Sequence, residues 1–341
     1  MSAKLRKINE QVMVITGATS GIGLTTARMA AEQGARLVLA ARSAEALDDL
    51  ASELRRQGCQ VAPVAADVGD PADVERIGQA AMERFGRIDT WVNNAGVSIF
   101  GRLEDVSLED HQRLFQTNFW GVVHGSLEAV KRMKTRGGGA IVNLGSEVSD
   151  RAVPLQGMYS ASKHAVKAFT DSLRMELEKE EAPISVTLIK PAAVDTMFTV
   201  HAKNYMDKEP ALPPPIYAPE LVANAILYAA QHPKRDVFVG GASKLVSVSG
   251  FTMPRTLDRY MRALMFRQQQ SKYNSAPGRR DALHAPDTSH ELRQRQGMSS
   301  NVVEHCPYTA VTLRSKPVTA ALLGGGALFA AWGLSRRRLA R

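Results

Sequence analysis

The stretch from Val12 to Gly34 constrains the fold of this chain more than any other. Val12-Met13-Val14-Ile15 is a short, continuous apolar run, which is typical of a strand buried on both faces of a parallel sheet. A glycine-rich turn and a helical pattern through Gln33 follow directly. Glycines let the backbone turn tightly and approach a pyrophosphate, which rests on the helix N-terminus. The sequence therefore predicts a dinucleotide site at this turn, with contacts from Gly17, Thr19, Ser20, Gly21, Ile22 and Gly23.

The second predicted strand ends where dinucleotide-binding folds distinguish NAD from NADP. In folds that bind NAD, an acidic residue near this point accepts a hydrogen bond from the ribose 2′-hydroxyl. Here the strand from Arg36 to Ala41 is followed by Arg42 and Ser43. Because a guanidinium suits a 2′-phosphate, the sequence favours NADP(H) over NAD(H) as the cofactor. The alternative is that Arg42 is a solvated loop arginine.

Strands and helices alternate along the rest of the first 250 residues. Apolar runs predict five further strands, at 61–68, 90–92, 140–144, 184–189 and 237–239, with helical patterns between them. Such alternation is typical of an α/β fold. The sequence predicts a Rossmann-like, doubly wound parallel sheet of about seven strands, forming one catalytic domain over residues 1–250.

Polar residues and glycine follow several of these strands. Ligands bind outside the carboxyl ends of parallel strands, so we expect these residues near the cofactor. The Asp67 carboxylate could accept from the adenine amino group, and Gly96 would let the backbone approach the ligand. The asparagines of Asn93-Asn94 could brace the central strands. Further cofactor contacts are expected from Val68, Asn94 and Ala95.

Tyr159 and Lys163 are the residues on which the predicted chemistry depends. On a helix they lie one turn apart on one face, so the phenol and the ammonium point at the same space. A nearby cation favours the phenolate and brings a pKa of ~10 toward the working range. Ser146, at the end of a strand, could hold the same substrate oxygen, and Asn118 should have a buried partner. The alternative for an isolated Y-x-x-x-K pattern is an amphipathic helix without function.

Residues 8 to about 245 resemble the short-chain dehydrogenase/reductase family. The T-G-x-x-x-G-I-G turn, the N-N-A-G strand end, Asn118, Ser146 and Y-x-x-x-K occur in the family's order and at its spacing. The resemblance implies that Tyr159 is the general acid of carbonyl reduction or the base of alcohol oxidation. It implies that Lys163 lowers the pKa of Tyr159 and holds the nicotinamide ribose. Ser146 would orient the substrate oxygen, and Asn118 would anchor a water in the proton relay.

The segment after the sixth predicted strand departs from the family pattern. The family usually has Pro-Gly where this chain has Pro191-Ala192, and alanine does not adopt positive φ cheaply. The resemblance implies cofactor carboxamide contacts through Val194 and Thr196. Residues 197–219 are rich in proline, which predicts a lid or substrate loop.

The chain beyond residue 250 lies outside this resemblance. Residues 251–267 predict an amphipathic helix with arginines, which packs on the core or a second copy, or lies on a membrane. Residues 268–316 predict a disordered linker. Residues 318–334 carry no charge, and a basic tail at 336–341 follows. They predict a membrane helix within 317–335, although about 25 Å of helix is short for a ~30 Å hydrocarbon core. The alternative is a soluble helix packed on the body.

Charge and cysteine content narrow the classes of function. Most of the net charge of +9 falls in residues 267–341, which suggests an anionic surface such as a membrane and argues against a nucleic-acid partner. Two distant cysteines, Cys59 and Cys306, indicate a reducing, cytoplasmic compartment. Neither has metal-ligand spacing, so we expect no metal.

These patterns lead to one main prediction and one alternative. We expect an NADP(H)-dependent oxidoreductase that interconverts a carbonyl and an alcohol. The membrane-like tail suggests a lipophilic substrate such as a steroid, retinoid or long-chain carbonyl compound. We expect a membrane-associated homodimer or homotetramer, with a soluble cytoplasmic protein as the alternative location. The alternative function is a membrane-attached scaffold or redox sensor that binds the cofactor without turnover.

Overall fold

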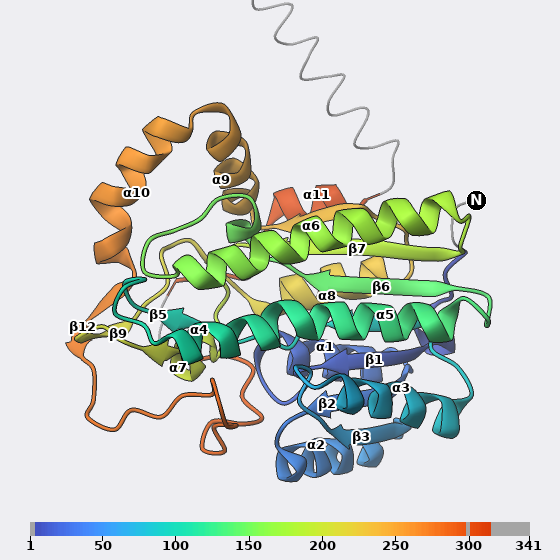
Figure 1. The fold of residues 1–341 in the computed structure, drawn as a ribbon. Helices are drawn as coiled ribbons and strands as arrows, with labels where there is room; N and C mark the ends of the chain where they lie inside the picture. Colours follow the sequence, from blue (N-terminus) through green and yellow to red (C-terminus); the bar gives the residue numbers. More distant parts are fainter. Residues whose placement is uncertain (1–3, 298–300, 315–341) are drawn as a thin grey trace, which may run out of the picture.

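The structure is a computed structural model that describes residues 4–297 and 301–314. A seven-stranded parallel sheet forms its centre, in the order β11, β7, β6, β4, β1, β2, β3 (Figure 1). Its strands are β1 (Val12–Thr16), β2 (Arg36–Ala41), β3 (Val61–Ala65), β4 (Thr90–Asn93), β6 (Gly139–Leu144), β7 (Ile184–Pro191) and β11 (Asp236–Val239). Since β2 and β4 pair with opposite edges of β1, the strand order changes direction there. The predicted doubly wound sheet of seven strands is confirmed.

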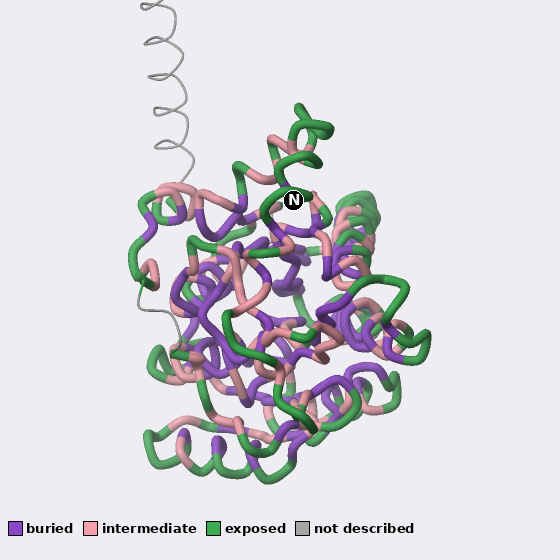
Figure 2. The backbone as a smooth tube through the Cα atoms, turned by 90° about the vertical axis from the view of Figure 1, so that its left-hand side faces the viewer, coloured by how far each residue is buried: buried purple, intermediate pink, exposed green. Residues whose placement is uncertain are grey.

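Helices cover both faces of the sheet. One face carries α1 (Gly21–Glu32), α2 (Ala44–Arg56) and α8 (Pro219–Ala229), and the other carries α3 (Pro71–Phe85), α5 (Gly121–Met133) and α6 (Gly157–Lys179). Burial on both faces explains why the central strands are continuous apolar runs in the sequence. Figure 2 shows buried residues along the sheet and the inner sides of the helices.

Local sequence signals set several helix ends. The Asp70 side chain accepts a hydrogen bond from the Ala72 N–H, and Pro71 occupies the first turn of α3. Gly86 ends the same helix with φ +73°, a conformation that glycine adopts without steric cost. Ser43 caps α2 by accepting from the Ala46 N–H. The serine next to Arg42 therefore has a structural role at the helix start.

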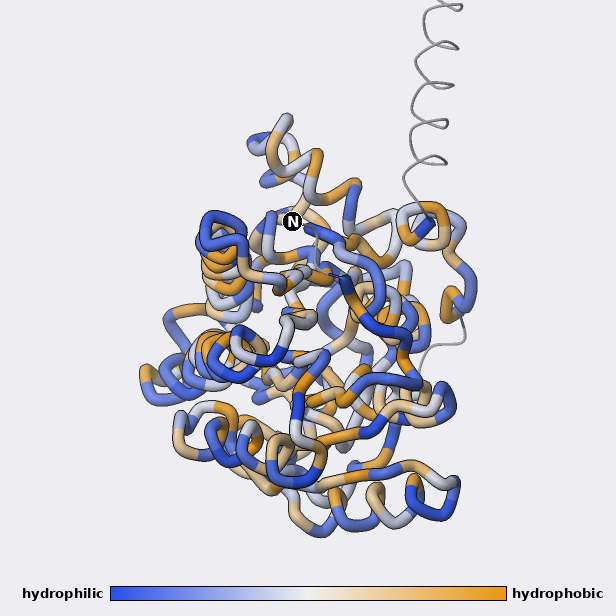
Figure 3. The backbone as a smooth tube through the Cα atoms, turned by 90° about the vertical axis from the view of Figure 1, so that its right-hand side faces the viewer, coloured by the Kyte–Doolittle hydropathy of each residue, from blue (hydrophilic) through white to orange (hydrophobic). Residues whose placement is uncertain are grey.

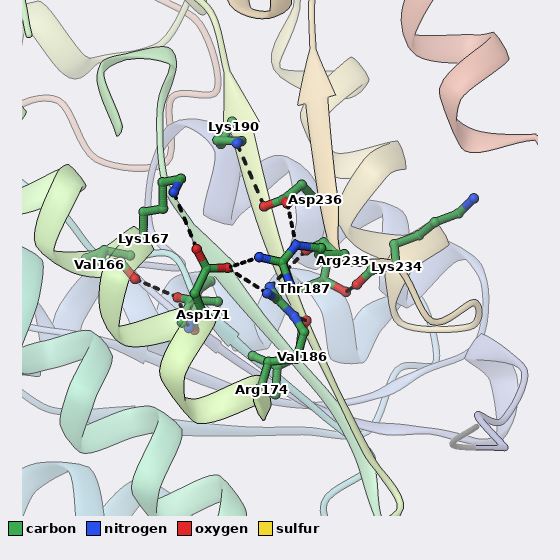
Figure 4. A network of polar contacts seen from close by, with 12 residues as sticks. Val166, Lys167, Asp171, Arg174, Val186, Thr187, Lys190, Lys234, Arg235 and Asp236 are labelled. Carbon is green, nitrogen blue, oxygen red and sulfur yellow. Dashed lines mark hydrogen bonds and ion pairs between the residues drawn. The ribbon is translucent and has the colours of Figure 1, made fainter. Parts of the chain in front are cut away.

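A polar cluster fixes α6 to the sheet far along the helix from Tyr159. Asp171 accepts from Arg174 and from Arg235, and Lys167 pairs with it one turn earlier (Figure 4). The Arg174 guanidinium also donates to the Val186 carbonyl of β7 and to the Arg235 carbonyl. These contacts tie α6 to β7 and to the segment before β11, so the helix cannot slide along the sheet.

A buried network braces the centre of the sheet, as predicted for the Asn93-Asn94 strand end. The Asn93 amide donates to Asn143 Oδ1 at 2.8 Å, across the β4–β6 pair. The Asn143 amide in turn donates to Thr170 Oγ1 of α6 at 2.9 Å. The Asn94 amide donates to the carbonyls of Thr16 and Gly17, which fixes the glycine-rich turn against β4.

Shorter elements surround this body. They are η1 (Ile8–Glu10), β5 (Ile99–Phe100), α4 (Leu108–Phe115), the π-helical turn η2 (Gln116–Trp120) and η3 (Glu147–Ser149). The predicted lid at 197–219 contains α7 (Phe198–His201), β8 (Lys203–Asn204), β9 (Lys208–Pro210) and β10 (Ile216–Tyr217). Its strands pair with β5, with β12 and with β13, so the loop is held at three places.

A helical arm formed by α9 (Gly241–Thr252) and α10 (Pro254–Gln268) projects from the body (Figure 1). Met261 and Met265 are its buried anchors, packed with Val148 and Val153. Figure 3 shows apolar and polar stretches alternating along the arm. The amphipathic pattern predicted at 251–267 thus covers the last two residues of α9, the turn at Met253 and all but the last residue of α10.

The chain from residue 268 to 314 differs from the predicted disordered linker. It forms β12 (Gln270–Asn274), β13 (Val302–Val303) and α11 (Pro307–Leu313), and residues 275–297 run along the body. Its side chains are too polar to show an apolar period, and ion pairs and backbone hydrogen bonds hold it instead. The stretch predicted as a membrane helix lies outside the described residues. Among residues 4–297 and 301–314, no helix has the length and apolar character needed to cross a bilayer.

Candidate active site

Two neighbouring cavities lie at the carboxyl ends of the central strands. The first has mostly apolar walls and is lined by Ile22, Asn94, Gly96, Leu144, Gly145, Ser146, Glu147, Val148, Val153, Gln156, Tyr159, Lys163, Pro191, Ala192, Ala193, Val194, Thr196, Phe198, Leu212, Pro213 and Met265. The second is more polar and is lined by Gly17, Thr19, Ser20, Ala41, Arg42, Ser43, Ala66, Asp67, Val68, Ala95, Gly96, Val97, Thr117, His201, Ala282, Pro286, Asp287 and Glu291. Gly96 lines both, so the two cavities adjoin.

The glycine-rich turn packs too closely for side chains. A Cβ at Gly23 would lie 2.1 Å from the Gly17 carbonyl oxygen, and one at Gly17 would lie 2.8 Å from Ala95 Cα. Gly17 and Gly21 also have positive φ, of +64° and +52°. The turn therefore brings backbone to the edge of both cavities, as the sequence predicts for a surface that a phosphate group approaches.

Tyr159, Ser146 and Lys163 lie together in the first cavity. The Lys163 ammonium donates to the Leu144 carbonyl at 2.8 Å and lies 5.7 Å from the centre of the Tyr159 ring. The Ser146 hydroxyl accepts from the Val148 N–H at 3.3 Å, and this bond starts η3. Because β6 ends at Leu144 and α6 packs beside it, residues 13 or more positions apart in sequence share one wall.

Burial shifts the pKa values of these groups. It raises the pKa of Tyr159 well above its ordinary value; the hydrogen bond with Ser146 lowers that pKa and the Glu147 carboxylate raises it. Burial also lowers the pKa of Lys163 from 10.5 to about 8. The sequence predicts that Lys163 lowers the pKa of Tyr159, and here burial outweighs any such effect. The reason is that an apolar wall disfavours the charged form of both groups.

Glu147 is a carboxylic acid in the apolar cavity. Burial raises its pKa from 4.5 to about 7, so its charge changes near neutral pH. It follows Ser146 directly in sequence, in η3. Sequence reasoning does not single it out, because one glutamate after a serine has no spacing signal.

Asn118 is fully buried in the π-helical turn η2. Its Oδ1 accepts from the Val97 N–H at 2.8 Å, and its amide donates to the Val97 carbonyl at 2.9 Å and to Ser162 Oγ at 3.3 Å. The predicted buried partner is therefore present. These bonds fix the backbone beside Gly96, and the water-anchoring role implied by the family resemblance stays a prediction.

Arg42 lines the second cavity and faces the C-terminal segment. Its guanidinium donates to the carbonyl oxygens of Leu283, at 3.1 Å, and of Ala282 and Ala285. Burial and the nearby Arg113 lower the pKa of Arg42. The alternative of a solvated loop arginine does not describe this residue, since residues 240 positions away cover it.

Asp67 also lies in the second cavity, at the end of β3. One carboxylate oxygen accepts from the Gly69 N–H at 2.9 Å and the other pairs with Arg113, which also donates to the Leu283 carbonyl. Arg113 has no counterpart among the predicted residues. Sequence reasoning also misses wall residues that lie far along the chain from the predicted ones and reach the cavities only through the tertiary fold: Met265, Ala282, Pro286, Asp287 and Glu291.

The second cavity has the groups that a dinucleotide needs. Glycine backbone, Arg42 and several hydroxyls line it, and Arg113 pairs with Asp67 of its wall. Two buried side-chain atoms in its wall, Thr117 Oγ1 and His201 Nε2, have no hydrogen-bond partner among the described residues. A bound ligand rich in hydroxyl and phosphate oxygens would supply such partners. No cluster of three metal-ligating side chains occurs within the part of the chain that the structure describes.

Comparison with known proteins identifies the family. Residues 11–206 match the family model for short chain dehydrogenases. The chain is 46% identical to the uncharacterized oxidoreductase YxnA of Bacillus subtilis, covering 98% of this chain and 93% of that protein. Its fold is similar to an alcohol dehydrogenase of Thermococcus sibiricus solved with 5-hydroxy-NADP (31% identity, TM-score 0.59, 67% and 95% of the two chains). It is also similar to a short chain dehydrogenase/reductase of Burkholderia phymatum solved with NAD (27% identity, TM-score 0.64, 81% and 100%).

The relatives and the observed geometry agree. A doubly wound sheet, a glycine-rich turn at its switch point and a tyrosine–lysine pair beside it are the features that the family resemblance led us to expect. The chain belongs to the short-chain dehydrogenase/reductase family of oxidoreductases.

Proposed function

We propose that the protein is an NADP(H)-dependent oxidoreductase that interconverts a carbonyl compound and an alcohol. The observation that carries the proposal is the meeting of the two cavities at Gly96, with Tyr159, Ser146 and Lys163 in the wall of the first. A nicotinamide dinucleotide, when bound, supplies or accepts the hydride. The chain's own residues hold the substrate oxygen and move the proton.

Each of the three side chains has a separate task in this proposal. The Tyr159 hydroxyl gives its proton to the substrate oxygen in reduction and takes it back in oxidation. The Ser146 hydroxyl donates a hydrogen bond to the same oxygen. The Lys163 ammonium, fixed by the Leu144 carbonyl, binds the nicotinamide ribose and supplies positive charge beside the phenol. Asn118 keeps the backbone at Gly96 in place between them.

The preference for NADP(H) rests on Arg42 and Arg113. Arg42 lines the second cavity where β2 ends, in place of an acidic residue, and Arg113 pairs with Asp67 of the same wall. A 2′-phosphate pairs well with such groups. One of the two solved relatives holds an NADP derivative and the other holds NAD, so they do not favour either cofactor for this chain.

The proposed substrate is lipophilic. Most side chains around Tyr159 are apolar, including Val148, Val153, Phe198 and Met265. Apolar walls gain roughly 25 cal/mol for each Å² of apolar ligand surface that they bury. A long-chain, steroid or retinoid carbonyl compound fits this chemistry better than a small hydrophilic ketone.

Membrane association and self-association remain part of the proposal. On the helical arm, Phe251 is 90% exposed and Leu245 is 68% exposed, and arginines of α10 lie among its apolar residues. A basic amphipathic surface of this kind suits an anionic membrane. Leu127 of α5 and Met175 of α6 are also exposed, which would suit an interface between two copies of the chain.

The test uses the purified full-length chain. NADPH and NADH are titrated separately by nicotinamide fluorescence, and ketones of increasing apolar length are then added while oxidation of the reduced cofactor is followed. We expect tighter binding of NADPH and turnover that rises with apolar length. Tyr159→Phe should bind NADPH normally and lose about 10²- to 10⁴-fold in kcat. Binding without turnover of any carbonyl compound would favour the scaffold alternative, and a folded chain that binds neither cofactor would refute the proposal.

A further inference from the structure

The C-terminal segment from Arg279 to Gly297, which we call the strap, runs along the open side of the second cavity. Ala282, Pro286, Asp287 and Glu291 of the strap line the cavity together with residues of the glycine-rich turn. In Figure 1 the orange segment that follows β12 passes below α7 and beside α1. The cavity wall therefore combines the first 20 residues of the fold with residues more than 260 positions later.

Arg279 anchors the start of the strap on the lid. Its guanidinium pairs with Glu209 at 2.9 Å and donates to the carbonyls of Thr199, Val200 and Ala202. These four contacts reach the loop at 197–219, which also lines the first cavity, and a further bond goes to the neighbouring Arg280 carbonyl. The side chain is largely buried, at 14% exposure. The strap and the lid thus form one connected structure over the two cavities.

The far end of the strap bonds to the glycine-rich turn itself. The Leu292 N–H donates to the Thr19 carbonyl at 2.8 Å, and the Gly21 N–H donates to the Arg293 carbonyl at 3.0 Å. The Gln294 amide then donates to Thr25 Oγ1 of α1 at 3.1 Å. Leu292 has φ +56°, a conformation that leucine rarely adopts, so these contacts hold the backbone in place. A ligand on the turn would lie beneath the strap.

His201 completes this wall from the lid side. Its backbone carbonyl accepts from the Ala282 N–H of the strap at 2.8 Å. Its Nε2 is buried in the cavity wall without a partner among the described residues. Burial lowers the pKa of His201 from 6.5 to about 4, so the ring is neutral at pH 7 and one ring nitrogen carries a proton. A buried nitrogen without a partner is costly, unless a bound ligand bonds to it.

We propose that the strap and His201 are part of the dinucleotide site, with His201 Nε2–H donating to a phosphate or ribose oxygen and the strap closing over the glycine-rich turn. The inference rests on the proposed function, because it assumes that the second cavity holds the cofactor. Since the strap covers the turn, the hydrogen bonds that join Thr19 and Gly21 to the strap must break each time the cofactor enters or leaves. Cofactor exchange is then limited by the strap.

Point variants of the full-length chain test the histidine. Dissociation constants for NADPH and NADH are measured by nicotinamide fluorescence on wild type, His201→Ala and His201→Gln. We expect His201→Ala to weaken both cofactors by about tenfold, as for a lost hydrogen bond to a charged or strongly polar group. His201→Gln keeps an N–H donor and should recover part of the loss. Unchanged affinity in His201→Ala would overturn the role of His201.

A second pair of variants tests the strap. Arg279→Met removes the anchor, and Arg280→Met removes the next arginine, whose side chain is exposed. Stopped-flow displacement of NADPH should show release at least several-fold faster in Arg279→Met and unchanged in Arg280→Met. Equal release rates in all three proteins would overturn the inference.

Hydrogen exchange on the wild-type chain tests the strap without any variant that could misfold. We expect NADPH to slow exchange of the amides in residues 282–294, whereas no change there would again overturn the inference. If the wild-type chain binds no cofactor at all, the proposed function itself is refuted. Failure of the proposed function can therefore be distinguished from failure of the inference about the strap.

Discussion

The two cavities differ in how the chain builds them. In the wall around Tyr159, Ser146 follows the end of β6, and Tyr159 and Lys163 lie on α6, which the Asn143–Thr170 bond joins to β6. The wall around Arg42 combines strand ends, the lid and the strap, and its residues run from Gly17 to Glu291. Burial is the largest cause of the pKa shifts of Tyr159 and Lys163 in the first cavity and of Arg42 and His201 in the second, and in the second cavity carbonyls and ion pairs also surround the charges.

This difference separates two properties of the enzyme. The groups that we propose for the proton transfer lie on buried elements, where burial shifts their pKa values. The groups that we propose for cofactor selection lie where several loops meet, so a change in the strap should alter binding without touching Tyr159. We expect substitutions in the first cavity to affect turnover, and those in the second to affect cofactor affinity and release.

After Tyr159→Phe, the largest expected effect comes from Lys163→Met in the first cavity. The substitution keeps the apolar stem and removes the ammonium, so kcat should fall by about 10²-fold or more. The wild-type ammonium, with its pKa lowered to about 8, is charged below that pH and neutral above it, so the contribution of Lys163 should fade as pH rises past 8. We would measure kcat from pH 6 to 10, together with the thermal melting temperature.

Lys167→Met, one turn further along α6, is the matched control and should leave kcat unchanged, since Lys167 pairs with Asp171 away from the cavities. Folding gives a second readout. The pKa of Lys163 is about 8 in the folded state and 10.5 in the unfolded chain, so the charged lysine disfavours folding at pH values below about 8. Removing it should therefore not lower the melting temperature at pH 7. Normal turnover in Lys163→Met would show that Lys163 in the first cavity does not take part in the reaction.

The next effect concerns Arg42 in the second cavity. Arg42→Gln keeps an N–H donor for the strap carbonyls but removes the charge, so NADPH affinity should fall by about tenfold or more while NADH affinity changes little. Titration of both cofactors measures the change in preference. Arg56→Gln removes an exposed charge at the end of α2 and serves as the control. Parallel losses for both cofactors would show that Arg42 acts through the strap instead of through a 2′-phosphate.

The smallest effect is expected from Glu147→Gln. Above its pKa of about 7, the Glu147 carboxylate raises the pKa of Tyr159, and so opposes the phenolate that alcohol oxidation requires. Removing the charge should raise kcat/KM for oxidation a few-fold at pH 8 and leave it unchanged at pH 5. The folded state also binds the Glu147 proton more tightly than the unfolded chain, so wild-type stability falls as pH rises from about 4.5 to 7.

The melting temperature of Glu147→Gln should accordingly exceed that of wild type at pH 8 more than at pH 5. Glu178→Gln, at an exposed position near the end of α6, is the control for the loss of one carboxylate. A pH profile for oxidation that is identical in Glu147→Gln and wild type would show that Glu147 does not reach Tyr159 electrostatically.

Much of the fold and one wall of each cavity could be predicted from the sequence. The seven strands and the glycine-rich turn have local patterns, because a buried strand requires a continuous apolar run and a tight turn requires glycine. Residues such as Ser146 and Tyr159 could be placed together because parallel strands end at one edge. The buried partner of Asn118 followed from its polar side chain in an apolar setting.

The sequence by itself determined the sheet, the turn and the spacing of Tyr159 and Lys163, because short-range patterns fix each of them. Only the tertiary structure decided the rest. The strap has no apolar period, and its backbone and ionic contacts with Thr19, Arg42 and Glu209 could not be read from its own residues. Burial, which depends on every element around the cavity, is likewise the largest cause of the pKa shift of Tyr159.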